Sequence, residues 1–396
     1  MRSTRRQLLP FSALSATYFA HIGFFNPYLP LWLQELGYSL MTLSLLMTVP
    51  SATRLLGPYA WGWLSDHTGE RVKLLRYSAT AALLISAGLW VQGGTAWLAL
   101  VLFLVFLHTS AMMPMSEAAL AHLVTRDGSF DARRYGRVRL WGSLGFLLTV
   151  FAAGAWFEAW GLGHFPAWTV ASLALVTASA WCLPDLKDAH APHEPKPSLR
   201  PVLRERTVQW FFAAAIFHVL AHMGLYIYFS LHLDALGYSK TVIGLMWAVS
   251  VIVEIIWFYT QGRWLPRLPL TGWLLLCALL AALRMAITAQ WAALWFMLLL
   301  AQCLHAFTFA AHHATCIAWL SQHFPGRLRG RGQALYAVLA YGAPGVLGGL
   351  TGGVISSRLG LPAVFWACAG CALLSAFCAW RLVRASAGLP PRTDAG

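Results

Sequence analysis

The stretch LWLQELGYS, residues Leu31–Ser39, recurs later in the chain as LHLDALGYS, residues Leu231–Ser239. Each copy follows a long apolar run and lies at the same place in its half of the chain, so the match indicates an internal repeat. Carrying the same offset forward aligns Arg54 with Glu254. The repeat therefore predicts a chain built from two equivalent halves.

The composition is that of an integral membrane protein, because 59% of the 396 residues are hydrophobic and only 11% are charged. A helix needs about 20 apolar residues to cross roughly 30 Å of hydrocarbon. The alternating pattern of a β-barrel is absent, so these segments satisfy their backbone groups only as helices. The sequence predicts an all-α fold with twelve transmembrane helices in two six-helix bundles, near residues 11–34, 41–64, 74–93, 96–121, 138–158, 165–183, 208–233, 240–262, 269–288, 291–320, 333–356 and 361–383.

A polar segment separates the sixth span from the seventh. It carries five prolines among charged residues, which is the composition of an extended, solvated linker. We expect an N-terminal bundle at residues 1–183, a cytoplasmic linker at 184–206 and a C-terminal bundle at 207–396.

The positive charge follows the loops. With a cytoplasmic N-terminus, all but four of the 28 Lys and Arg residues fall on the cytoplasmic side; the exceptions are Lys240, Arg358, Arg54 and Arg284. This positive-inside bias predicts that both termini are cytoplasmic in a plasma (bacterial inner) membrane. The net charge of +14 is thereby explained without nucleic acid as a partner.

The string YGRVRLWGSLGF, residues Tyr135–Phe146, carries Arg137 and Arg139 into an apolar helix. An arginine at the centre of a membrane helix costs about 3 kcal/mol, so it needs a partner or a substrate. A hairpin that turns near Gly128 would bring Glu117 to the depth of Arg139. Arg139 is the better candidate for a substrate or Glu117 contact, and Arg137 for an anchor at the helix start.

Glu254 lies deep in the eighth span, where a carboxylate is tolerated only if it is paired or periodically protonated. We consider a proton carrier and a fixed ion pair with Arg284 or Arg54. His305, Thr308 and His312 share one helical face, and His218 and His222 share another. Each histidine either faces a cavity or simply packs. A zinc site made from His218, His222, His312 and His313 is disfavoured, because no acidic or thiolate ligand accompanies them.

The first span carries Tyr18, His21, Phe25 and Tyr28 at a spacing that aligns their rings. Such an aromatic wall suits a substrate with a ring. Aromatic side chains also fill packing surfaces in a membrane protein, and the sequence leaves both interpretations open.

The loop between the second and third spans reads GWLSDHTGERVK, from Gly62 to Lys73, and resembles the signature loop of the major facilitator superfamily. With twelve spans and a central linker, the resemblance covers the whole chain. It implies that Gly62, Asp66, Gly69 and Arg71 belong to a loop that latches the two halves in one conformation. Glu70 stands where the family usually has a basic residue.

Within this superfamily the chain resembles the phenylpropionate permease family and, more distantly, the lactose permease branch of oligosaccharide:proton symporters. The resemblance rests on YLPLWL (Tyr28–Leu33), Glu117, YGRVRLWGS, Glu254, Arg284 and LHAFTF (Leu304–Phe309). It implies that Glu117 and Arg139 hold the substrate and that Glu254, Arg284 and His305 belong to the substrate and proton-coupling network. We therefore predict a substrate-binding set of Tyr28, Glu117, Arg139, Ser143, Phe146 and His305, and a proton-coupling set of Glu254, Arg284 and His305.

One departure from lactose permease matters. The carboxylate that carries the coupled proton there corresponds to Thr308 here, and a nearby lysine corresponds to Gln302. If protons are coupled, Glu254 or a histidine has to carry them.

The resemblance and the residues together predict proton-coupled uptake of a small organic solute, such as an aromatic carboxylate, by alternating access. A sugar or nucleoside symporter is the alternative within transport, and drug efflux is a further one. A membrane enzyme is disfavoured, because the chain lacks a nucleotide-binding loop, a cluster of metal ligands and a GxSxG elbow. The expected partners are the solute, H+ and the bilayer; we expect no cofactor and a functional monomer.

Overall fold

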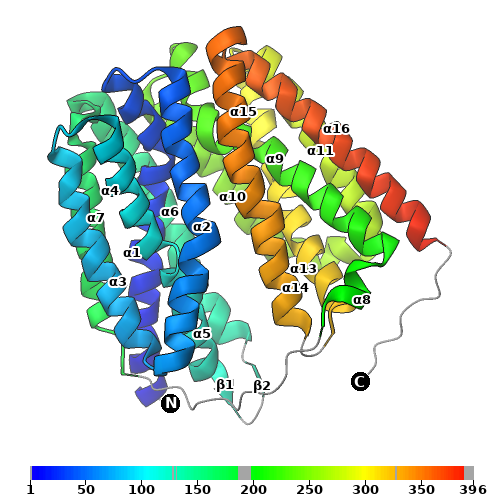
Figure 1. The fold of residues 1–396 in the computed structure, drawn as a ribbon, viewed down its shortest axis with the longest axis horizontal. Coiled ribbons are helices and arrows are strands. Elements are labelled where there is room, and N and C mark those ends of the chain that lie inside the picture. Colours follow the sequence, from blue (N-terminus) through cyan, green and yellow to red (C-terminus); the bar gives the residue numbers. More distant parts are fainter. Residues whose placement is uncertain (1, 127–128, 131, 186–197, 326–327, 388–396) are drawn as a thin grey trace. The chain divides into compact units, whose positions relative to one another are not determined.

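The computed structural model describes residues 2–126, 129–130, 132–185, 198–325 and 328–387 (Figure 1). Within them, eleven helical segments are long and apolar enough to cross a membrane. The predicted span 165–183 forms the 17-residue helix α7 (Phe165–Trp181), which is shorter than each of these eleven. The predicted all-α membrane fold is confirmed, and the described β-structure is a two-residue ladder between β1 (Thr125–Arg126) and β2 (Ser129–Phe130).

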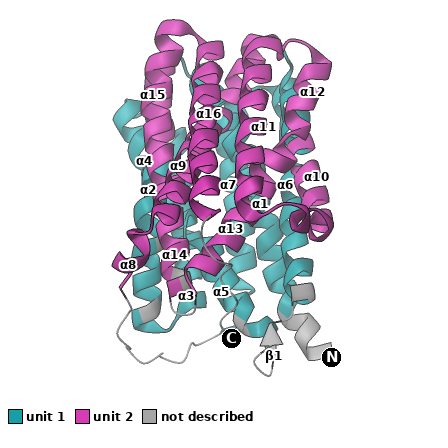
Figure 2. Cartoon of the chain, turned by 90° about the vertical axis from the view of Figure 1, so that its right-hand side faces the viewer, with its two compact units in different colours: residues 1–38, 49–192, 238–248 teal, residues 39–48, 193–237, 249–396 magenta. Residues whose placement is uncertain are grey.

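The chain forms two compact units (Figure 2). Unit 1 contains residues 1–38, 49–192 and 238–248, and unit 2 contains residues 39–48, 193–237 and 249–396. Each unit is thus one half of the sequence plus a short segment of the other half. The predicted linker lies mostly outside the described residues, and its end forms one helical turn, α8 (Arg200–Leu203).

The first half of the sequence supplies most of unit 1. Its helix α1 packs along α6 and α7, and α3 packs against α4, α5 and α7. The elements are α1 (Arg2–Glu35), α2 (Leu40–Thr68), α3 (Arg71–Ser86), η1 (Ala87–Trp90), α4 (Gly94–Thr109), α5 (Met112–Val124), α6 (Ala132–Trp160), η2 (Leu162–His164) and α7.

The second half supplies most of unit 2. Its helix α9 packs along α16 and α15, and α11 packs against α16, α12 and α13. The elements are α9 (Arg206–Ala235), α10 (Lys240–Trp264), η3 (Leu265–Arg267), α11 (Leu270–Trp291), α12 (Trp295–Cys303), η4 (Ala306–Ala311), α13 (His312–His323), α14 (Leu328–Tyr336), η5 (Ala337–Gly342), α15 (Ala343–Leu359) and α16 (Leu361–Ser386).

The repeated LGYS sequence ends one helix and starts the next in both halves. Gly37 and Gly237 follow α1 and α9 with φ of +84° and +82°, a left-handed conformation that glycine adopts without strain. Ser39 then accepts a hydrogen bond from the backbone N–H of Thr42, and Ser239 accepts one from the N–H of Val242. These serines act as N-caps of α2 and α10, so the sequence repeat is also a structural repeat.

Two tyrosines at equivalent positions of the repeat are buried and have their hydroxyls satisfied. Tyr28 of α1 lies 3.1 Å from the carbonyl oxygens of both Val150 and Lys240, which accept its hydroxyl hydrogen. Tyr228 of α9 donates to Ser44 Oγ at 2.7 Å. Each tyrosine therefore ties its own helix to the segment that its unit takes from the other half of the sequence.

Small residues let α1 and α6 approach closely in unit 1. A Cβ at Gly142 would lie 2.7 Å from the Phe19 ring, and a Cβ at Gly23 would lie 2.8 Å from the Phe146 carbonyl oxygen. A Cβ at Gly145 would collide with the Ala16 carbonyl oxygen. The contact depends on backbone proximity, as is common between membrane helices.

Replacing Gly145 by alanine is therefore expected to lower the stability of the protein. Overpacking of this kind typically costs about 1–3 kcal/mol, and here the obstacle is backbone that has little freedom to move. Gly136→Ala is the matched control, because it lies in the same helix with open space around the added Cβ. Thermal unfolding in detergent measures both, and an equal melting temperature for the two variants would contradict the packing account.

Three spans that the sequence predicts as continuous are interrupted. The fourth breaks at Ser110 and Ala111, because the ring of Pro114 clashes with the carbonyl four residues before it. The tenth and eleventh spans each contain a π-helical turn, η4 and η5. Pro344 follows η5 and explains the wide turn there in the same way. In the tenth span no proline accompanies the turn, which lies directly after His305.

Candidate functional site

The predicted contact between Glu117 and Arg139 is present in unit 1. Glu117 is on α5, Arg139 is on α6, and Glu117 Oε1 lies 3.5 Å from Arg139 Nε. Both side chains are more than a third exposed, at 37% and 39%, so this pair contributes little to stability. Tyr135, one turn before Arg139, is hydrogen-bonded to Glu117. The turn predicted near Gly128 lies outside the described residues.

Aromatic side chains accompany Arg139. Its guanidinium carbon lies 4.6 Å from the centre of the Phe19 ring, which is a cation–π contact. Ser143 and Phe146 follow one and two turns later on α6, and both are partly buried. Residues four and seven apart share a helical face, so they continue the surface on which Arg139 lies. Arg137 is exposed, as expected for an anchor.

The other aromatic residues of α1 pack inside unit 1. Tyr18, His21, Phe25 and Tyr28 are all buried. His21 Nδ1 lies 2.8 Å from Ser172 Oγ, and the Tyr28 hydroxyl is taken by the backbone contacts described above. In this structure these side chains hold α1 against its neighbours, and a substrate role for Tyr28 stays a prediction.

A second polar cluster lies in unit 2 around Arg284 of α11, which is 2% exposed. Its Nη1 donates to His305 Nδ1 at 2.9 Å and to Thr308 Oγ1 at 3.0 Å, and its Nη2 donates to Gln302 Oε1 at 3.2 Å. Ser250 of α10 donates to the same Gln302 oxygen at 2.6 Å. A buried cation is thus held by three neutral acceptors. We call these residues, together with Glu254, the Arg284 cluster.

His305 stands between the arginine and the carboxylate. Arg284 has only donors, so His305 Nδ1 accepts and the hydrogen of the neutral ring is on Nε2. Nε2 lies 3.6 Å from Glu254 Oε2, and the Glu254 side chain is 25% exposed. The sequence leaves a direct pair of Glu254 with Arg284 open, whereas the structure places an imidazole between them. Arg54, the other partner considered, is an exposed residue of α2.

Sequence reasoning missed that Gln302 and Thr308 accept hydrogen bonds from Arg284, and that Ser250 donates to Gln302. Gln302, His305 and Thr308 are spaced three residues apart, and in a regular α-helix that spacing drifts around the surface. The π-turn η4 begins directly after His305 and changes this register. Wide turns of this kind are frequent at functional sites. The three-residue spacing of polar residues was the available signal.

Most of the predicted loop is helical in unit 1: Gly62 and Asp66 lie in α2, and Arg71 begins α3. The connection between the two helices is Gly69 and Glu70. Gly69 has a φ of +65°, and Arg71 Nε donates to Ser65 Oγ at 3.3 Å across the turn. A Cβ at Gly62 would meet nothing, and the side chain of Asp66 lies outside the described residues. A latch role for this loop stays a prediction.

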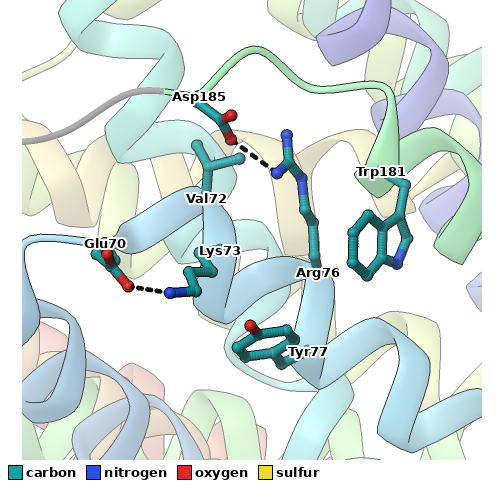
Figure 3. Close-up of a pocket in the computed structure, with 7 residues that line it drawn as sticks. All are labelled: Glu70, Val72, Lys73, Arg76, Tyr77, Trp181 and Asp185. Atoms are coloured by element: carbon teal, nitrogen blue, oxygen red, sulfur yellow. Dashed lines mark ion pairs between the residues drawn. The ribbon is translucent and has the colours of Figure 1, made fainter.

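A small cavity of about 340 Å³ opens beside this loop (Figure 3). Lys73 Nζ lies 2.9 Å from Glu70 Oε2, and Arg76 Nη1 lies 2.7 Å from Asp185 Oδ1. Arg76 also lies over the Trp181 ring at 5.5 Å. Both cations are paired with carboxylates, so the cavity offers no free anion site. The Arg76–Asp185 pair joins α3 to the segment that follows α7.

Comparison with known proteins places these features in context. A family model described as "MFS_1 like family" matches residues 11–367. A protein of Escherichia coli (strain K12) named "Probable 3-phenylpropionic acid transporter" is 26% identical over 367 residues, which cover 91% of this chain and 94% of the relative. A maltose permease of Geobacillus stearothermophilus is 26% identical over 354 residues, covering 88% of this chain and 87% of the relative.

Solved structures share the fold. The nucleoside transporter NupG superposes with a TM-score of 0.81 at 14% identity, covering 96% of this chain and 99% of that one. The POT family transporter PepTSo superposes with a TM-score of 0.80 at 11% identity, covering 97% and 99%. At these identities the likeness concerns the fold alone.

Proposed function

We propose that this chain, which belongs to the MFS_1 like family, imports a small aromatic carboxylate together with a proton by alternating access. The chain is a multi-pass membrane protein and a transporter of the major facilitator type, with a small molecule as its substrate. The identity of the solute and the coupled ion are the proposal. The surroundings of Arg139 support the class of solute, and the Arg284 cluster supports the proton as the coupled ion.

The observation that carries the substrate class is the setting of Arg139. It contacts Glu117 through Nε, and its two terminal nitrogens make no hydrogen bond within the described part of the chain. A guanidinium presents two parallel donors that match a carboxylate. The Phe19 ring and the neighbouring Phe146 provide an apolar surface for an aromatic ring. The relative named as a 3-phenylpropionic acid transporter supports the same class of solute.

The Arg284 cluster supports coupling to protons. Glu254 is its one carboxylate, is partly exposed, and faces a histidine that an arginine holds in a defined tautomer. When this carboxylate takes or releases a proton, its charge beside His305 and Arg284 changes. Glu254 is therefore the proposed proton carrier, with His305 and Arg284 as its positioning partners.

The remaining assignments follow from the charge distribution of the sequence. The positive-inside bias supports a bacterial inner-membrane location with both termini in the cytoplasm. We propose that the monomer is the functional form, because one chain holds both clusters.

A sugar or nucleoside is the second candidate, and Glu117 favours it. Its carboxylate is 37% exposed and accepts hydrogen bonds, as a polyhydroxylated solute requires. This candidate assigns Glu117 to direct binding, whereas an aromatic acid leaves it as a support for Arg139.

A thermal-shift screen with Glu117→Gln separates the two candidates. A ligand at 100 times its Kd stabilises a protein by about 2.7 kcal/mol. We expect 3-phenylpropionate to raise the melting temperature of the wild type and of Glu117→Gln, since the amide oxygen still accepts from Arg139. Maltose and a nucleoside are expected to leave both unchanged. Stabilisation of the wild type by a hydroxylated solute, lost in the variant, would establish the second candidate instead.

A further inference from the structure

The interior of unit 2 holds another group of titratable side chains, which we call the histidine stack: His218 and His222 of α9 and His312 of α13. All three are buried. The rings of His218 and His312 are 3.5 Å apart and nearly parallel, at 7°. The rings of His218 and His222 are 4.8 Å apart at 26°. The three imidazoles thus form one continuous stack.

The hydrogen positions of two rings follow from their partners. His218 Nε2 lies 2.7 Å from the carbonyl oxygen of Thr308, and His222 Nδ1 lies 2.9 Å from the carbonyl oxygen of His218. A carbonyl oxygen only accepts, so each of these nitrogens carries a hydrogen. In the neutral rings, the opposite nitrogens, His218 Nδ1 and His222 Nε2, carry lone pairs.

These two lone pairs are buried and have no hydrogen-bond partner within the described residues. Burying a hydrogen-bond acceptor without a donor is unfavourable, and here each of two adjacent rings has such an unpaired acceptor nitrogen. The arrangement points to something that the nitrogens accept. Because the rings are in contact with each other, a proton is the ligand that needs no additional volume.

We propose that the histidine stack binds one proton and is a second proton-binding site of this transporter, beside Glu254. The inference rests on the proposed coupling to protons. The proton adds to the lone pair of His218 Nδ1 or His222 Nε2 and forms an N–H bond. It comes from a hydronium ion, which becomes water, or from the protonated carboxyl of Glu254, which becomes a carboxylate.

The geometry limits the stack to one proton. A first imidazolium is attracted to the face of the neutral ring beside it. A second would place two like charges within a ring-to-ring distance of 3.5–4.8 Å, which strongly disfavours double protonation.

Thr308 joins the stack to the Arg284 cluster. Its carbonyl accepts from His218, and its hydroxyl accepts from Arg284. A change of charge in the histidine stack therefore acts on Arg284 through Thr308, and a change at Arg284 acts on the stack through the same residue. The charged and titratable groups that face the stack from the surrounding elements are Arg284 of α11, His305 before η4, His313 and Cys316 of α13, and Tyr336 of α14 through Cys316.

A proton count on the purified protein tests the stack directly, without transport. The wild type and the double variant His218→Gln/His222→Gln are titrated in detergent from about pH 8 to about pH 5, the range in which histidine changes its charge. We expect the double variant to bind one proton fewer than the wild type. A difference of two would mean independent histidines, and no difference would mean permanently neutral rings; either result would overturn the inference.

Transport then separates this inference from the proposed function. In proteoliposomes, the double variant is expected to exchange 3-phenylpropionate but to carry fewer protons per solute than the wild type. His313→Gln, next to the stack on α13, is the control and should keep the wild-type ratio. A wild type that moves solute without protons contradicts the proposed function while the proton count still reports on the stack. An unchanged ratio in the double variant contradicts the stack alone.

If the double variant fails to fold, the wild type labelled with 15N-histidine is followed by NMR, with His222→Gln used for assignment. One protonation shared by the His218 and His222 signals supports the proposal, and signals that do not move with pH overturn it.

Discussion

Glu254→Gln is expected to abolish uphill accumulation of the solute while leaving exchange across the membrane intact. Glutamine imitates the protonated carboxyl permanently, so the transporter can bind and reorient but cannot release or take up a proton at this position. With one proton per solute, an inward gradient of two pH units supports roughly 100-fold accumulation, since each tenfold ratio is worth about 1.4 kcal/mol. The variant is expected to show none.

The measurement compares two assays on the same proteoliposomes, gradient-driven uptake and counterflow of labelled 3-phenylpropionate. Glu205→Gln is the matched control, because it removes another carboxylate of unit 2 that lies at the start of α9, outside the Arg284 cluster. It should retain both activities. Uphill uptake with proton entry in Glu254→Gln would show that the proton is carried elsewhere, and joint loss of uptake and counterflow would show that Glu254 is structural.

Arg139→Lys is expected to weaken binding far more than Arg137→Lys. Lysine keeps the charge but cannot offer two parallel donors to a carboxylate. Hydrogen bonds to charged groups are worth about 1.5–3 kcal/mol, which corresponds to a roughly 10- to 100-fold higher Kd for 3-phenylpropionate. Arg137 is exposed on the same helix, so its variant keeps the charge of an anchor and should change the Kd little.

Binding is measured on the purified variants, and their melting temperatures establish that both are folded. Equal and small changes in Kd at the two positions would mean that Arg139, like Arg137, only orients the helix in the membrane. The proposed carboxylate site would then be wrong.

The fold was predictable because its main signals are local or periodic. Apolar length predicted the helices, and the LGYS repeat predicted that equivalent helices end alike; Gly37 and Gly237 indeed follow helices with the same left-handed conformation. The interruptions of the fourth, tenth and eleventh spans were harder to predict from the sequence. Pro114 and Pro344 are visible in the sequence, but a proline in a membrane helix is compatible with either a continuous or a broken span.

The contact between Glu117 and Arg139 was predictable, because it follows from the positions of the two residues along adjacent spans. Arg139 and Glu117 are charged residues at similar depth on adjacent spans, and they are in contact. In unit 2 the sequence analysis named Arg284, His305 and Thr308, but it named neither Ser250 nor the hydrogen bonds that join these side chains. The π-turn η4 alters which side chains meet Arg284, and it leaves no proline or glycine signal in LHAFTF. The stacking of His218 on His312 joins two helices that no sequence pattern connects.

We propose that an aromatic carboxylate and a proton enter together through this protein. Proteoliposomes without an initial pH gradient are loaded with a pH-sensitive dye, and labelled 3-phenylpropionate is added outside. The dye reports proton entry, and the label that accumulates inside reports solute entry. We expect the lumen to acidify in step with solute entry, and both signals to exceed those of protein-free vesicles. Solute entry through the protein without any change in lumenal pH beyond that of protein-free vesicles would contradict this proposal.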